Sequence, residues 1–101
     1  MKLIVITETN YELTNIITVI TEDKFEELKE KLISNAIEKL KESSENSINS
    51  IAPYKIFLGN KYFTKNTFGI KYHSSQLVNN QYIERDETIN YNYQYITLNE
   101  F

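Results

Sequence analysis

His73 is the only histidine in a chain of 101 residues that contains no cysteine. A nucleophilic mechanism would therefore need a serine or threonine that His73 activates, and Ser74 and Ser75 follow it directly. No glycine-rich elbow surrounds these serines, and the chain has only two glycines, so neither an oxyanion hole nor a phosphate-binding loop is expected. The sequence therefore predicts a protein that is not an enzyme.

Three carboxylates lie close together in the sequence, at Glu84, Asp86 and Glu87. Side chains at positions 84 and 86 of a strand would share one face and could hold a divalent cation. Arg85 lies between them, however, and the spacing is not that of an EF-hand loop. We expect these residues to form a charged connection between the last two strands, and we expect neither a metal nor a cofactor.

A basic and aromatic stretch without acidic residues extends from Asn46 through Ile83. Its lysines alternate with aromatic residues, as in surfaces that bind single-stranded nucleic acid, where cations follow the backbone and rings stack on bases. The simpler interpretation is that the rings face inward and the lysines solvate the outer surface. Nucleic acid is therefore the less expected partner, and its candidate residues are Lys55, Lys61, Lys65, Lys71, Tyr62 and Phe63.

Tyrosine occupies every second position near the carboxyl end, and Ile89 precedes this row. In a strand such alternate side chains lie on one face. The row either completes a core with its hydroxyl groups at the edge, or it contacts a protein partner, because tyrosine offers a large and rigid contact area. For the second interpretation the candidate partner-binding residues are Tyr11, Tyr82, Tyr91, Tyr93 and Tyr95.

The elements that must position these residues begin with a hairpin. Residues 2–7 and 13–20 are mostly apolar or β-branched, which predicts two paired strands. Apolar residues at helical spacing then predict a long amphipathic helix over about residues 22–42. A stretch rich in serine and asparagine predicts a loop at about 42–53.

The C-terminal part is predicted to form a mainly antiparallel sheet of about four strands. Gly59-Asn60 fits a tight primed turn between two of them, and Asn79-Asn80 predicts another, with a longer loop over 74–80 as the alternative. The resulting order is ββαββββ. It is an α+β fold with the helix across one face of the sheet, in a single domain of residues 1–101.

Apolar strand residues are more numerous than one helix can cover. Both faces of residues 13–20 are hydrophobic, with Leu13, Ile17 and Val19 on one side and Ile16 and Ile20 on the other. Either the sheet curls on itself or its second face is covered by another molecule. For the second case we expect the uncovered surface to bind a protein, with a homodimer as one form of this binding.

The expected function is that of a non-enzymatic protein-binding inhibitor or regulator. The chain is acidic, with a net charge of -3, and its richness in isoleucine, asparagine, lysine and tyrosine is typical of an AT-rich genome, which points to a low-GC bacterium or its phage. Small proteins of this kind include anti-CRISPR-like and anti-restriction-like inhibitors of bacterial defence nucleases, and also immunity proteins that block toxins. The amino-terminal "MKLIVITET" is too short for a signal-peptide core or a membrane span, so we expect a cytoplasmic location.

Overall fold

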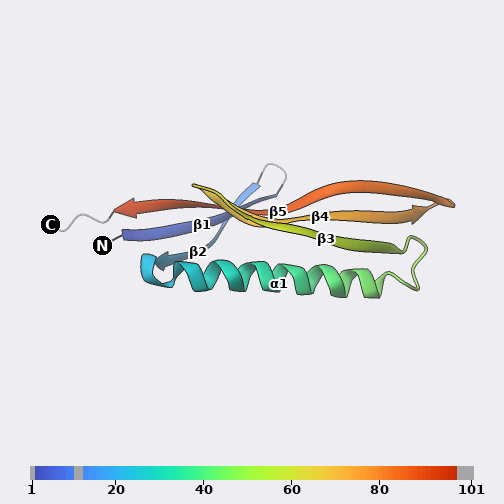
Figure 1. Cartoon of the computed structure of the whole chain (residues 1–101), viewed down its shortest axis with the longest axis horizontal. Helices are drawn as coiled ribbons and strands as arrows, with labels where there is room; N and C mark the ends of the chain where they lie inside the picture. Colours follow the sequence, from blue (N-terminus) through green and yellow to red (C-terminus); the bar gives the residue numbers. More distant parts are fainter. Residues whose placement is uncertain (1, 11–12, 98–101) are drawn as a thin grey trace.

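A five-stranded antiparallel sheet with one long helix against it makes up the molecule (Figure 1). The computed structural model describes residues 2–10 and 13–97. The elements are β1 (Lys2–Asn10), β2 (Leu13–Thr21), a 3-10 turn η1 (Glu22–Lys24), α1 (Phe25–Asn46), β3 (Tyr54–Phe63), β4 (Thr67–Val78) and β5 (Gln81–Thr97). The strand order is β2-β1-β5-β4-β3, and the α+β class is confirmed. The molecule is elongated, with extents of 64 × 26 × 21 Å.

The amphipathic helix is confirmed, but it continues to Asn46 instead of ending near residue 42. Its last turn is held by serines that reach the start of β3. Ser44 Oγ donates to the carbonyl oxygen of Tyr54 at 2.9 Å, and the buried Ser47 accepts the Tyr54 amide proton at 3.0 Å. These tertiary hydrogen bonds compensate for the low helix propensity of serine and shorten the predicted loop. Among the described residues, no helix is long and apolar enough to cross a membrane.

The predicted turn at Gly59-Asn60 is wrong. Both residues lie inside the continuous strand β3, where the register with β4 shifts between Leu58 and Lys61, as in a β-bulge. A side chain at position 59 would place its Cβ 2.9 Å from the carbonyl oxygen of Lys71, so glycine permits close approach of β4 here and does not form a turn. The chain reverses instead at residues 64–66, and the C-terminal part has three strands, not four.

The turn at Asn79-Asn80 is confirmed, and the alternative loop over 74–80 is wrong. Both asparagines have positive φ angles, 50° and 63°, as a type I′ turn requires, and Val78 pairs directly with Gln81. This turn leads into β5, which pairs with β4 through residues 81–92 and with β1 through residues 91–97. The strand β5 therefore connects the two hairpins into one sheet.

The carboxylates at positions 84, 86 and 87 do not form a connection between strands, as the sequence suggested. They lie inside β5, opposite β4. The prediction failed because β5 has 17 residues and continues through a charged segment, which is possible where its side chains face solvent and not a core.

The core lies between α1 and one face of the sheet. Tyr91 is only 7% exposed and stacks on Phe68 with a centroid distance of 5.2 Å, and this burial raises the pKa of its phenol. The Tyr93 ring lies 4.7 Å from Phe25, and its hydroxyl donates to the carbonyl oxygen of Thr64. The cluster of buried residues comprises Ile4, Ile6, Phe25, Ile33, Phe68, Ile70 and Tyr91. Two of the three tyrosines in the row thus pack in or against the core.

Replacement of Tyr91 by alanine is expected to lower the free energy of unfolding by about 3–5 kcal/mol, since it removes a stacked, buried ring. The matched control is Tyr82→Ala, because Tyr82 is 71% exposed on the same strand and should change the free energy by less than about 0.5 kcal/mol. Urea unfolding followed by circular dichroism measures both. Similar losses for the two variants would contradict the placement of Tyr91 in the core.

Candidate binding surface on the open face of the sheet

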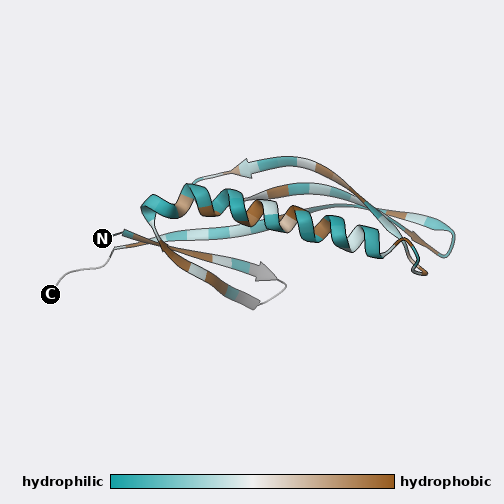
Figure 2. Cartoon of the chain, turned by 90° about the horizontal axis from the view of Figure 1, so that it is seen from below, coloured by the Kyte–Doolittle hydropathy of each residue, from teal (hydrophilic) through white to brown (hydrophobic). Residues whose placement is uncertain are grey.

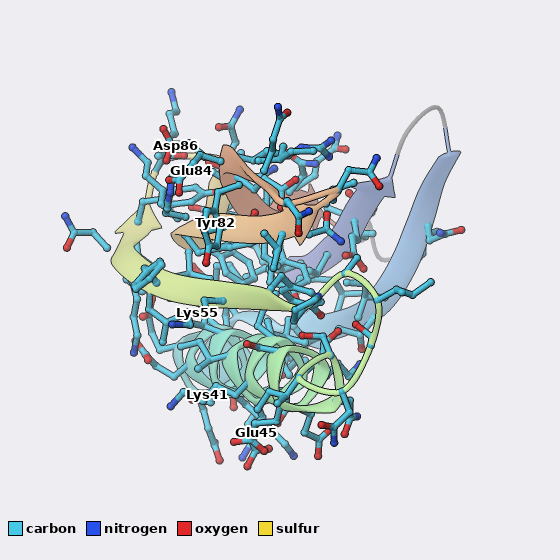
Figure 3. All side chains as sticks on the ribbon, turned by 90° about the vertical axis from the view of Figure 1, so that its right-hand side faces the viewer. Lys41, Glu45, Lys55, Tyr82, Glu84 and Asp86 are labelled. Atoms are coloured by element: carbon cyan, nitrogen blue, oxygen red, sulfur yellow. The ribbon has the colours of Figure 1, made fainter. Side chains whose placement is uncertain are left out.

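The helix covers only one side of the sheet, and we call the opposite side the open face. Figure 2 shows α1 crossing the sheet while the β1–β2 hairpin diverges from it. In Figure 3, Lys41 and Glu45 of α1 lie on one side of the sheet, and Glu84 and Asp86 lie on the other. Because β4 places Phe68 and Ile70 toward α1, its alternate residues, including Lys71 and His73, belong to the open face.

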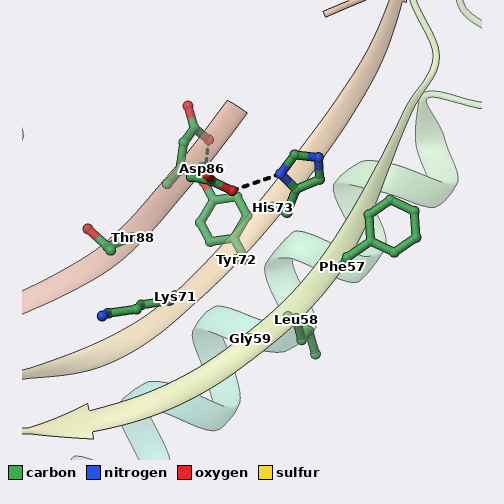
Figure 4. Close-up of a pocket in the computed structure, with 9 residues that line it drawn as sticks. Phe57, Leu58, Gly59, Lys71, Tyr72, His73, Asp86 and Thr88 are labelled. Atoms are coloured by element: carbon green, nitrogen blue, oxygen red, sulfur yellow. Dashed lines mark hydrogen bonds and ion pairs between the residues drawn. The ribbon is translucent and has the colours of Figure 1, made fainter. Parts of the chain in front are cut away.

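His73 is held between two carboxylates on this face. The register of β4 and β5 places it opposite Asp86, and its Nδ1 lies 2.8 Å from Asp86 Oδ1 (Figure 4). Its Nε2 bonds to Glu84 Oε2. The hydrogen bond to Asp86 and then the one to Glu84 raise the pKa of His73, and the bond to His73 is the main cause that lowers the pKa of Glu84. The arrangement favours a charged imidazolium.

The two serines beside His73 do not complete a nucleophilic pair. Ser75 Oγ donates to Glu84 Oε1 at 2.9 Å, so its proton goes to a carboxylate that already binds the imidazole. Ser74 is opposite Arg85 in the register and therefore belongs to the other face of the sheet. Both ring nitrogens of His73 are engaged by carboxylates, which leaves neither of them to activate a hydroxyl group.

A pocket with an exposed aromatic ring adjoins this charged network. Phe57 on β3 is 54% exposed, and its ring centroid lies 6.1 Å from that of His73. The close-up in Figure 4 shows Phe57, Lys71, His73, Asp86 and Thr88 around the pocket, contributed by the three strands β3, β4 and β5. The surface thus combines an apolar ring with charges of both signs, which can serve a protein contact.

Next to the pocket, Tyr62 bridges three strands across Gly69. Tyr62 pairs with Gly69 on β4, and its hydroxyl donates to Asn90 Oδ1 on β5. A Cβ at position 69 would lie 2.8 Å from the Tyr62 hydroxyl oxygen and 1.9 Å from the carbonyl oxygen of Ile89. Glycine is therefore required beneath the tyrosine, and the bridge stiffens the open face.

The other end of the open face, on β1, β2 and β5, is apolar. Ile16 is 70% exposed and Val19 is 51% exposed. The expectation that they lie on opposite faces is wrong, because the bulge at Ile17 shifts the register and places both on the open face, where they pair with Thr7 and Val5 of β1. Ile96 of β5 is 39% exposed and pairs with Leu3 of β1. Bulky side chains therefore remain in contact with solvent along much of the length of this face.

The basic and aromatic residues predicted to bind nucleic acid are divided between the two faces. Lys61 pairs with Glu30 of α1 at 3.2 Å, and the Phe63 ring lies 5.4 Å from the Lys29 ammonium, so both residues face the helix. Lys65 lies in the turn before β4. The register places Lys55, Lys71 and Tyr62 on the open face, which also carries Glu84 and Asp86. Nucleic-acid binding stays a prediction.

The tyrosines predicted to contact a partner do not gather at one place. Tyr91 and Tyr93 pack in or against the core, and Tyr95 is 49% exposed at the helix-facing margin. Tyr82 is exposed on the open face near the Asn79-Asn80 turn. Tyr11 lies outside the described residues. Partner binding by these tyrosines stays a prediction.

Sequence reasoning missed Phe57 and the pairing of His73 with its carboxylates. A signal for the pairing was present, because a two-residue turn at Asn79-Asn80 requires position 73 to lie opposite position 86.

Within the described part of the chain, no group of histidine and acidic residues has a geometry that could hold a metal ion.

The imidazole of His73 is expected to titrate above its ordinary pKa, and Asp86→Asn should lower this pKa toward the ordinary value. The pKa of His73 is higher in the folded state than in the unfolded state. The stabilisation that charged His73 gains from Asp86 and Glu84 is therefore complete below the unfolded pKa of about 6.5, and it is lost as the pH rises through the folded pKa. Ring-proton NMR measures the titration. Between mildly acid and mildly alkaline pH, the free energy of unfolding should fall more in the native chain than in the control variant His73→Gln. Equal decreases in the two proteins would contradict the bonding of His73 to Asp86 and Glu84.

Comparison of the chain with protein-family models, with curated proteins and with solved structures finds no match.

Proposed function

We propose that this protein is a non-enzymatic inhibitor or regulator that binds a protein partner through the open face of its sheet. The observation that carries this proposal is the exposure of bulky side chains on the face that α1 does not cover. Phe57, Tyr82 and Ile16 are each more than half exposed there. Exposed apolar groups of this kind, interspersed with polar groups, are typical of surfaces that dock another protein.

The state of the chemically active side chains supports a binding role. His73 uses both ring nitrogens to bind carboxylates, and Ser75 donates its proton to one of the same carboxylates. Such a network consumes the hydrogen-bonding capacity that a catalytic base would need. It also holds the charged groups in defined positions, which favours specific recognition of a partner over chemistry on a substrate.

The centre of the proposed contact is Phe57. An exposed aromatic ring surrounded by polar groups resembles the organisation of a binding hot spot, in which the ring is desolvated by the partner and the polar rim excludes water. Asp86 is 94% exposed and Lys71 is exposed on the same face, so both signs of charge are accessible to a partner. This mixture favours a protein over the uniformly negative backbone of a nucleic acid.

The class of partner that we propose is a bacterial defence nuclease, with the protein encoded by a phage or mobile element and acting in the cytoplasm of the infected cell. The amino-acid composition supports this choice, since it is typical of an AT-rich genome. Small proteins that block such nucleases by surface contact need no cofactor and no catalytic group. A small folded domain with a rigid, exposed sheet meets these requirements.

Addition of the protein to CRISPR and restriction nucleases should inhibit plasmid cleavage by at least one of them. Phe57→Ala should weaken the inhibition by about tenfold or more, because truncation of a central aromatic residue removes hot-spot energy. Phe63→Ala is the matched control, since Phe63 is a similarly exposed aromatic residue on the same strand but faces the helix, and it should leave inhibition unchanged.

Two results would contradict the proposal. One is the absence of inhibition across the nucleases together with no stable complex by mass photometry. The other is binding of single-stranded DNA that weakens steeply with salt and is lost in Lys55→Glu and Lys71→Glu, which would support the nucleic-acid alternative instead.

A further inference from the structure

The two edges of the sheet are built differently. The outer strand β3 carries Lys55 and Lys61, follows Pro53 and contains the bulge at Gly59-Asn60. Charged residues, proline and bulges are the features by which natural sheets prevent an edge from pairing with another strand. The edge at β3 is therefore protected.

The edge at β2 has less of this protection, and its irregularity is the register shift with β1 between Ile6 and Thr7, which leaves Ile17 of β2 as an extra residue. Its sequence, LTNIITVIT, contains no charged residue, no proline and no glycine over nine residues. In the part of the chain that the structure describes, β2 pairs with β1 alone, so the backbone groups on its outer side have no strand partner. Side chains of both faces are exposed along it, with Ile16 at 70%, Ile17 at 37% and Val19 at 51%. Such an edge is a template for pairing.

We propose that β2 pairs in antiparallel orientation with β2 of a second copy of this chain, about a twofold axis, and extends the five strands into a ten-stranded sheet. A twofold axis brings each side chain of the strand opposite one from the same strand. Since the strand is uncharged, no like charges within it face each other, and its side chains are largely β-branched, a type that favours cross-strand contact. The acidic Glu22 and Asp23 lie beyond the strand, in η1.

The position of the helix leaves this edge accessible. α1 packs toward β3 and β4, while the β1–β2 hairpin diverges from it (Figure 2). Pairing along β2, interrupted at the bulge at Ile17, would extend for up to about 30 Å and would satisfy outer backbone groups on either side of the bulge. An edge contact buries less than a standard interface of about 800 Å² per partner, so we expect a dissociation constant in the micromolar range.

The consequence for function is that the apolar ends of two open faces become continuous. Ile16 and Val19 of the two copies would lie near the axis and form one broad apolar strip. This inference does not depend on the proposed inhibitory function, because the dimer is defined by the β2 edge and not by Phe57.

Sedimentation equilibrium of the full chain, from micromolar to near-millimolar concentration, tests the proposal. The average molar mass should rise with concentration from 12.0 kDa to twice that value and then remain constant, because the protected β3 edge cannot pair with a further copy. Ile16→Lys should raise the dissociation constant by about tenfold or more, because it brings like charges together across the axis. Val19→Lys should do the same, and circular dichroism identifies any variant that fails to fold.

The matched control is Phe57→Lys, which places the same charge on the open face near the β3 edge and should leave the dimer intact. Backbone amides of β2 should also exchange more slowly with solvent as concentration rises. A mass that stays at 12.0 kDa throughout would overturn the proposal. Growth beyond the dimer would also overturn it, as would a dimer that Phe57→Lys dissociates and Ile16→Lys does not, which would indicate face-to-face packing.

Discussion

One helix covers one face of a sheet that is wider than itself, and the rest of the structure depends on this mismatch. An α-helix with its side chains is about 10–12 Å across, whereas five strands extend over about 19 Å. The core can therefore form only beneath α1 and along the strands next to it. The hairpin β1–β2 reaches past the helix, and no element within residues 2–10 and 13–97 covers the opposite face of the sheet.

The two faces of the sheet are stabilised by different interactions. On the covered face, aromatic rings from α1, β4 and β5 pack edge-to-face and in stacks, so large side chains fill the space beneath a single helix. On the open face, polar groups bond to one another, as Tyr62 does with Asn90 and His73 does with Asp86. These contacts order a solvent-exposed sheet without burying it, and they leave Phe57 beside them exposed.

An exposed sheet with an ordered surface is suited to binding because little conformational entropy is lost when a partner docks on it. The open face and the β2 edge offer two different modes of contact. The face presents side chains, and its selectivity depends on Phe57 and the charges around it. The edge presents backbone groups, which any compatible strand can use, and its uncharged sequence matches a second copy of itself.

The sequence by itself determined the α+β class, the first hairpin, the long helix and the turn at Asn79-Asn80, because amphipathic periodicity and positive-φ preference are properties of a few neighbouring residues. It did not determine the role of Gly59-Asn60, since the choice between a turn and a bulge depends on the strand that lies opposite. Nor did it decide which tyrosines are buried or that Phe57 lies next to His73. Those outcomes depend on the register between distant strands and on the side of the sheet that the helix occupies, and only the tertiary structure specifies them.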